Sequence, residues 1–311
     1  MVHQMISQAE AKAAILDLLR GAVPERDDEI CSIWSQYAPI VEIVPDRPGV
    51  TMRATDKRIQ FSLKTIDLYW LLGFSAWKSI EAYSPAILIA SDSGIPIQKV
   101  LDRDEALGKF ERDYKARFAA AQDLIEATTT GDIDWPPDVP RPQGDRDAFS
   151  DDQDKAAFDL SLLALASALL HELKHVIYLN EKNNPATLPE EEIGCDVWAR
   201  EFLTVKLAEY AQAHSHDYED VCAKRATSIA LAAIIVYAIT PSHGHWGTSD
   251  YPPIADRLEA LINGFPLPPN SKFWVWTACL VVGILRKQHR AVNITGDSPK
   301  VLVERLLSEL R

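Results

Sequence analysis

The sequence predicts an α+β fold that is mainly α-helical, with a small antiparallel sheet in its N-terminal half. Residues 41–44 and 50–62 alternate apolar and polar side chains and contain β-branched residues, which indicates strands and a β-hairpin that turns near Asp56. From residue 156 onward, long stretches instead repeat apolar residues at helical spacing. The two patterns together indicate a sheet followed by a helical core.

A stretch rich in proline and aspartate, residues 131–154, separates these two patterns. It contains four prolines and eight aspartates, a composition that excludes regular structure and predicts a loop. We therefore expect an N-terminal α+β part at residues 1–130, this loop, and a helical part at residues 155–311, all within one continuous unit. The loop is either a solvated connection or a lid over a cleft.

The N-terminal part is expected to contain helices beside the hairpin, at residues 7–19, 28–37, 64–83 and 104–128. Pro85 is expected to end the third of these helices, because proline lacks the backbone N–H that the next turn needs. The apolar run Ala86–Ala90, bounded by polar residues, then predicts a strand.

The helical part is expected to contain five helices, at residues 156–180, 189–214, 218–240, 254–263 and 273–288. Gly and Pro punctuate residues 241–253, which predicts a loop. The apolar runs Ala226–Thr240 and Phe273–Leu285 are 15 and 13 residues long. A membrane span needs about 20, so both indicate buried core helices.

Composition and charge exclude several classes of protein. With 311 residues, 47% of them hydrophobic and 25% charged, the chain is an ordinary globular protein. Its net charge of −13 argues against nucleic-acid binding, which depends on clustered Lys and Arg. Four scattered cysteines and no signal-peptide pattern at the start indicate reduced thiols and a cytoplasmic location, with no membrane partner.

The segment His171-Glu172-Leu173-Lys174-His175 forms an HExxH motif on a predicted core helix. Positions i and i+4 lie about 40° apart around a helix, so His171 and His175 share a face and can bind one Zn²⁺. Glu172 is rotated by about 100° and can act as general base on metal-bound water. The alternative is a pair of core histidines satisfied by hydrogen bonds.

A catalytic zinc site needs a third protein ligand, and the pattern HExxHxxGxxH is excluded because Tyr178 and Glu181 occupy its Gly and third His positions. The segment 187–196 offers a better source. Thr187 and Glu190 form a predicted capping box that starts a helix. Glu192 follows, with Asp196 at i+4 on the same face. We expect Glu192 to be the ligand and Asp196 to orient a zinc histidine.

The acidic residues of this helix could also have roles outside the metal site. Glu190 and Glu191 suit the positive end of the helix dipole, and Glu192 could be a third glutamate of that kind. Asp196 could be an exposed helix residue. Cys195, between the two acidic positions, is expected to be a small buried residue and no ligand.

The arrangement HELKH…EEIGCDVWA resembles the HExxH…ExxxD gluzincins and, more specifically, the Lit-type phage-exclusion peptidases. The resemblance covers residues 156–202, extending to about 258. It implies a helical zincin-like core, His171, His175 and Glu192 as zinc ligands, and Glu172 as base. It also implies a protein substrate, elongation factor Tu, and a phage-derived activator.

Two features of the site stay open at this stage. The donor that stabilises the oxyanion is expected among His243, His245, Tyr251 and Arg257; related peptidases often have His-Pro where Tyr251 stands. We take Tyr251 and His245 as the catalytic candidates. Gluzincins commonly hold the substrate against an edge strand, which residues 58–62 or 86–90 could supply.

The sequence thus predicts a zinc-dependent endopeptidase that cleaves a specific intracellular protein. Two alternatives remain. One is a membrane-associated zincin that uses the two apolar runs as spans, and the other is a non-catalytic helical protein that serves as an interaction module.

Overall fold

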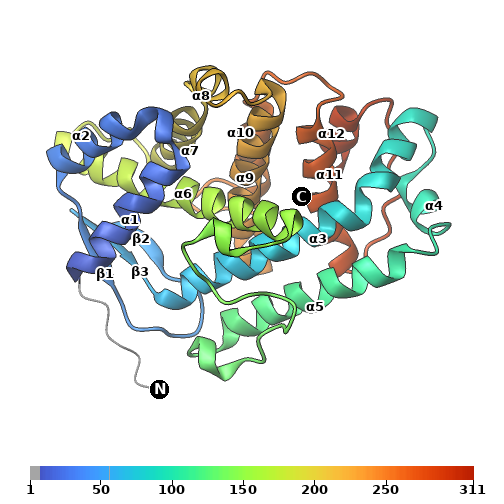
Figure 1. Cartoon of the computed structure of the whole chain (residues 1–311), viewed down its shortest axis with the longest axis horizontal. Coiled ribbons are helices and arrows are strands. Elements are labelled where there is room, and N and C mark those ends of the chain that lie inside the picture. Colours follow the sequence, from blue (N-terminus) through green and yellow to red (C-terminus); the bar gives the residue numbers. More distant parts are fainter. Residues whose placement is uncertain (1–7, 56) are drawn as a thin grey trace.

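The computed structural model describes residues 8–55 and 57–311 and is 68% helical with one three-stranded sheet, which confirms the predicted fold class (Figure 1). Its α-helices are α1 (Gln8–Ala22), α2 (Asp27–Tyr37), α3 (Leu63–Ser93), α4 (Ile97–Leu101), α5 (Leu107–Glu126), α6 (Asp152–Glu181), α7 (Leu188–Thr204), α8 (Leu207–His214), α9 (Tyr218–Ile239), α10 (Ile254–Asn263), α11 (Lys272–Lys287) and α12 (Pro299–Ser308). Short 3₁₀ turns are η1 (Pro24–Arg26), η2 (Thr130–Asp132), η3 (Arg146–Ala148) and η4 (Ser242–Gly244).

The sheet has the strand order β1-β3-β2, with β1 at Ile40–Ile43, β2 at Met52–Thr55 and β3 at Arg58–Phe61. The predicted hairpin is confirmed, since β2 and β3 pair antiparallel; its turn residue Asp56 lies outside the described residues. β1 pairs parallel to β3, so the sheet is mixed and the prediction of an antiparallel sheet holds for the hairpin alone. The connection between β1 and β2 carries the chain across the sheet and leaves β3 central.

Helix α3 continues through Pro85, so the predicted strand at residues 86–90 is wrong. Proline in a helix interior costs about 3 kcal/mol, because it removes one hydrogen bond and crowds the preceding turn. The turns after Pro85 bury Ala86, Ile87 and Ala90 at helical spacing. Since α3 packs against α5, α6 and α11, this burial outweighs the local penalty.

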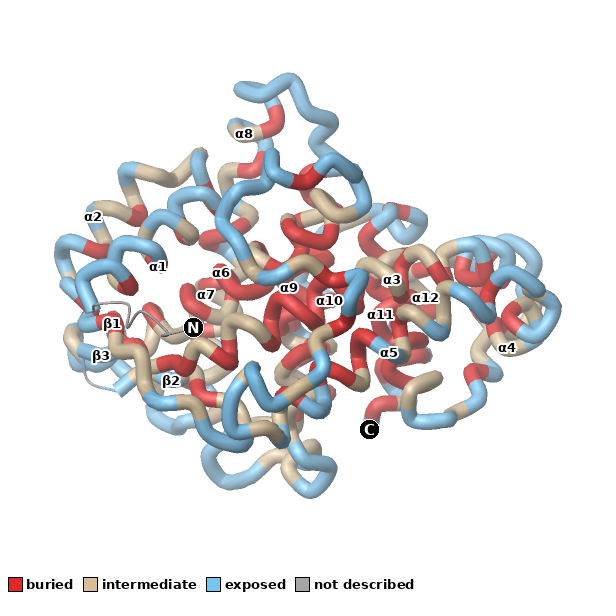
Figure 2. Tube along the Cα trace, turned by 60° about the horizontal axis from the view of Figure 1, so that its bottom comes forward, coloured by how far each residue is buried: buried red, intermediate tan, exposed pale blue. Residues whose placement is uncertain are grey.

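Helices α6 and α9 lie at the centre of the molecule, where 14 of the 30 residues of α6 and 14 of the 22 residues of α9 are buried (Figure 2). By length and composition both could cross a membrane, yet 67% and 72% of their most apolar windows are buried inside the protein. This burial is what the core helix of a globular protein shows. Around α6 pack α3, α7, α9 and the strands β2 and β3.

The proline-rich stretch at residues 131–154 is a loop apart from the turns η2 and η3 and the start of α6. It is fastened to α3 and α5: Trp70 donates a hydrogen bond to the Pro140 carbonyl at 2.8 Å, and Arg117 pairs with Asp138 at 2.9 Å. Val139 and Phe149 are buried. The loop contributes no residue to the lining of the central cavity described below, so the lid alternative has no support in this arrangement.

Two helical details differ from the sequence prediction. The segment 189–214 breaks into α7 and α8, and α8 folds back so that Leu207 and Ala211 pack on Val221 and Cys222 of α9. The C-terminal helix α12 was not predicted, although Ser298 caps its first turn by accepting a hydrogen bond from the Val301 amide. All four cysteines are free, as expected.

Candidate active site

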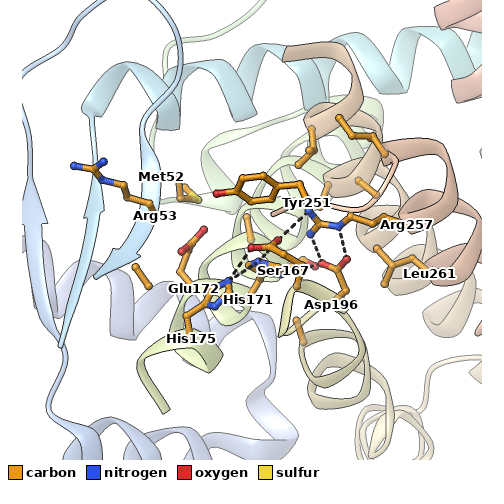
Figure 3. A pocket seen from close by; sticks show the side chains of 18 of the residues that line it. Met52, Arg53, Ser167, His171, Glu172, His175, Asp196, Tyr251, Arg257 and Leu261 are labelled. Carbon is orange, nitrogen blue, oxygen red and sulfur yellow. Dashed lines mark hydrogen bonds and ion pairs between the residues drawn. The ribbon is translucent and has the colours of Figure 1, made fainter. Parts of the chain in front are cut away.

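The HExxH motif lies near the C-terminal end of α6, as predicted. Asp151 caps the start of this helix by accepting a hydrogen bond from the Gln153 amide, and Lys182 ends it in a left-handed conformation with φ of 54°. The one-turn spacing brings the two imidazoles together, with ring centroids 4.9 Å apart and the two Nε2 atoms 3.1 Å apart. Figure 3 shows both rings at the floor of one cavity.

Helix α7 places Glu192 opposite the two imidazoles. The predicted capping box of Thr187 and Glu190 is present and fixes where this helix starts. One carboxylate oxygen of Glu192 lies 3.4 Å from Nε2 of His171 and the other 3.4 Å from Nε2 of His175. The residues predicted as ligands from two separate helices therefore converge.

These distances fit a zinc ion. Two ligand atoms about 2.05 Å from a tetrahedral Zn²⁺ lie roughly 3.3 Å from each other. The two Nε2 atoms lie 3.1 Å apart, and each lies 3.4 Å from one of the two Glu192 oxygens, which is close to that separation. Each imidazole also has a carboxylate beside its Nδ1, which can accept the Nδ1 proton and leave Nε2 to bind a cation. Two Nε2 atoms held that close suit a shared cation.

The two Nδ1 atoms have different carboxylate partners. Asp196 Oδ1 lies 2.8 Å from Nδ1 of His171, in the place predicted for it. Glu191 Oε1 lies 2.6 Å from Nδ1 of His175, a contact that the sequence analysis missed because it treated Glu191 as a helix-dipole residue. The sequence did contain a signal for this contact. Two zinc-binding histidines need two acceptors for their Nδ1 protons, and Asp196 supplies only one.

Arg257 of α10 joins the carboxylates of α7. Its guanidinium donates to both oxygens of Asp196 at 2.8 Å and lies 3.0 Å from Glu192 Oε2. The hydrogen bonds to Asp196 and the charge of Glu192 outweigh burial and raise the pKa of Arg257, which stays charged. Arg257 was one of four candidates for the oxyanion donor. In the structure its N–H groups contact the carboxylates of Asp196 and Glu192 instead.

The other oxyanion candidates occupy different places on the loop between α9 and α10. Tyr251 lines the cavity, is 55% exposed, and extends its ring over the imidazoles in Figure 3. His245 points elsewhere: its Nε2 lies 3.1 and 2.9 Å from the carbonyls of Tyr237 and Thr240, and its ring stacks on Tyr237. Neither His245 nor the exposed His243 lines the cavity, so this placement favours a structural role for His245 over the predicted catalytic one.

Glu172 lies between the imidazoles and strand β2 (Figure 3). Burial raises the pKa of its carboxyl group, and His171 and His175 partly oppose that effect. A hydrogen bond from the backbone of Ala54 also reaches this carboxylate. A raised pKa suits a group that must take up a proton and release it again.

The edge strand beside the site is β2. Residues 58–62 include the central strand β3 and residues 86–90 are helical, so both predicted edge strands are wrong. Ser62 donates to the Thr51 carbonyl, and the antiparallel alternation then turns the N–H and C=O groups of Met52 and Ala54 away from β3. Met52, Arg53 and Ala54 line the cavity, and the outward N–H of Ala54 donates to the Glu172 carboxylate.

The cavity has a volume of about 450 Å³. Beyond the imidazoles it continues between α9 and α10, where its wall is apolar: Ile229, Ala232, Ala233, Val236, Ile239, Ile254 and Leu261. One end is polar and the other is apolar, which is typical of a site that orients a ligand by polar groups and holds it by apolar ones.

Cys195 lies closer to the site than expected. It is fully buried, and its Sγ comes within 4.8 Å of nitrogen atoms of both imidazoles. Burial and the carboxylates of Glu192 and Glu191 raise the pKa of its thiol, so the thiol keeps its proton. The pKa of Glu192, by contrast, is lowered: hydrogen bonds to the two imidazoles outweigh the effect of burial. An ionised carboxylate is the better metal ligand of the two.

Comparison with known proteins identifies the class of enzyme. The family model of peptidase U49 matches residues 59–277, which include α6, α7 and α10. The chain belongs to the peptidase U49 family. This U49 peptidase is also similar to a cell death peptidase of Escherichia coli (strain K12), with 21% identity over 298 residues that cover 92% of this chain and 91% of the relative. No solved structure matches it. The chain is therefore a peptidase, and its substrate is a protein or peptide.

Proposed function

We propose that this U49 peptidase is a zinc-dependent endopeptidase. His171, His175 and Glu192 are the ligands, and Glu172 is the general base. The observation that carries the proposal is that the two Nε2 atoms lie 3.1 Å apart and that each of them lies 3.4 Å from one oxygen of the Glu192 carboxylate. Zinc bound there would activate a water molecule and polarise the scissile carbonyl.

The residues of the chain have separate roles in this reaction. Glu172, with its raised pKa, takes the proton of the attacking water and passes it to the leaving amine. Asp196 fixes the orientation of His171, and Arg257 holds Asp196 in place. Burial raises the pKa of Tyr251, which keeps its hydroxyl protonated as a donor for the tetrahedral oxyanion.

The cavity supports an extended protein segment as substrate. The outward N–H and C=O groups of Met52 and the outward C=O group of Ala54 can pair with such a segment as an added strand, a mode that recognises the backbone and leaves side chains to the cavity wall. The apolar wall of α9 and α10 favours a bulky apolar residue next to the scissile bond. This segment lies inside a longer chain, which makes the enzyme an endopeptidase.

The biological substrate is an intracellular protein, and elongation factor Tu is the first to test. The resemblance to Lit-type peptidases supports this choice, together with a phage-derived activator, a cytoplasmic location and a role in phage exclusion. The name of the cell death peptidase fits an enzyme whose activity stops growth of its own cell. The two apolar runs of the membrane-associated alternative lie in α9 and α11, and the burial of both helices inside the protein argues against it.

Replacing Glu172 by Gln tests the proposal against a non-catalytic role. The variant should keep about one zinc per chain and lose cleavage of elongation factor Tu by at least about 10²-fold, because only the base is removed. The assay includes a phage lysate as source of the activator, with wild-type protein as positive control. Wild-type protein that binds no zinc, or an E172Q variant with full activity, contradicts the proposal.

A further inference from the structure

Two consecutive glutamates engage the two nitrogens of one imidazole. Glu191 Oε1 lies 2.6 Å from Nδ1 of His175, and Glu192 Oε1 lies 3.4 Å from its Nε2. Consecutive residues of a helix point about 100° apart, so their side chains start out in different directions. Here the two carboxylates contact opposite edges of the His175 ring, so the ring lies between them.

Glu191 is buried although its place in the helix would allow it to lie at the surface. It lies in the first turn of α7, where glutamate is ordinarily stabilised at the surface by the helix dipole, yet it is only 8% exposed. Its neighbour Glu190, in the same turn, is exposed and completes the capping box. Burying a carboxylate is costly unless partners satisfy it, so the direction of the Glu191 side chain reflects the contacts that it makes inside.

Both oxygens of Glu191 have partners. The first accepts from His175, and the second accepts from the side-chain amide of Asn184 at 2.9 Å. Asn184 belongs to the short connection between α6 and α7, which begins with the left-handed Lys182. The connection that joins the two site helices thus also fixes the carboxylate between them.

Glu191 differs from the other histidine partner, Asp196. Asp196 shares its charge with Arg257 through two hydrogen bonds of 2.8 Å. Among the described residues, Glu191 forms an ion pair with His175, and its other partner Asn184 is neutral. The charge of Glu191 therefore acts mainly on His175.

We propose that Glu191 is a positioning residue for zinc binding and that Asn184 holds its carboxylate in place. The inference rests on the zinc site proposed above. Glu191 keeps the proton of His175 on Nδ1 and aims the Nε2 lone pair at the ion position. Without this carboxylate, His175 loses both its preferred tautomer and its fixed orientation.

Zinc affinity of the purified full-length protein tests this proposal, measured by competition with a chromophoric chelator. We expect Glu191→Gln to weaken zinc binding about 10- to 100-fold, as loss of such partners does elsewhere. Glu191→Asp, which keeps the charge, should recover part of the loss. Asn184→Ala should cost less than Glu191→Gln, because it loosens the carboxylate without removing it.

Glu190→Gln is the matched control, since it removes a carboxylate from the same turn that contacts neither imidazole. Thermal unfolding of the zinc-free variants separates the proposed role from a merely structural one, which would lower the melting temperature and leave zinc affinity unchanged. Wild-type protein without zinc overturns the proposed function. Tight zinc binding by wild type together with equal affinity in Glu191→Gln overturns this inference alone.

Discussion

Arg257 and Asp196 are joined by two hydrogen bonds of 2.8 Å although they lie 61 residues apart in the chain. The pair ties α10 to α7 directly behind His171. Both side chains are largely buried, with 14% and 12% exposed. The contact therefore links the stability of the helical core to the geometry of the candidate zinc site.

Replacing Arg257 by Met should destabilise the zinc-free protein by about 3–5 kcal/mol, because it leaves Asp196 buried without its countercharge. Urea unfolding of wild type and variant measures this difference. Arg257→Lys should lie between the two, since an ammonium group cannot form both hydrogen bonds. A loss of unfolding free energy below about 1 kcal/mol is the range of exposed ion pairs, and it would contradict a buried Arg257–Asp196 pair that stabilises the protein.

Cys195 separates two possible ligand sets. Because Glu192 supplies the third ligand in the proposed site, Cys195→Ala should keep the full zinc content and cost only about 1 kcal/mol of stability. Glu192→Gln should lose most of the zinc under the same conditions. Metal analysis after dialysis against dilute zinc decides this, and the reverse pattern would make Cys195 the third ligand.

Strand β2 provides a test of substrate binding. Met52→Pro removes a backbone N–H that points away from β3, and the pairing with β3 does not use that group. Cleavage should fall at least about tenfold with zinc content unchanged. Met52→Val shortens the side chain but keeps the N–H and serves as control. Equal losses in both variants would mean that the side chain is what matters at residue 52.

Glu111 provides a prediction far from the site. It accepts hydrogen bonds from Tyr83 at 3.0 Å and from Arg286 at 2.8 and 3.1 Å, which joins α3, α5 and α11. Burial alone would raise the pKa of Glu111, but the hydrogen bonds from Arg286 and Tyr83 lower it below 4.5. Glu111→Gln should cost about 2 kcal/mol near neutral pH.

The pH dependence of that loss follows from the lowered pKa. The stabilisation by Glu111 is fully present above the unfolded value of 4.5 and disappears as the pH falls through the lower folded value. The difference between wild type and Glu111→Gln in urea unfolding should therefore shrink as the pH falls below 4.5. The exposed pair of Lys300 and Glu304, 3.9 Å apart, is the control, and Glu304→Gln should change stability by less than about 0.5 kcal/mol.

The sequence predicted what depends on local periodicity and spacing. The HExxH helix, the capping box at Thr187 and the facing positions of Glu192 and Asp196 all follow from helical geometry. The continuation of α3 through Pro85 did not, because burial between distant helices decides it. The local rule that proline ends a helix would place the end of α3 at Pro85.

Side-chain direction was the second limit. Glu190 and Glu191 look alike in the sequence, yet one caps a helix and the other contacts His175. His245 looked like a catalytic donor, but the end of α9 offers it two carbonyls. Such choices depend on which tertiary partner lies within reach, and periodicity does not encode that.

A crystal structure of the zinc-loaded protein, with anomalous data collected at the zinc absorption edge, tests the central claim most directly. We predict one zinc peak bound by Nε2 of His171, Nε2 of His175 and a carboxylate oxygen of Glu192, with the open position facing Glu172 and β2. A peak elsewhere, or zinc bound at the imidazoles without Glu192, would contradict the account.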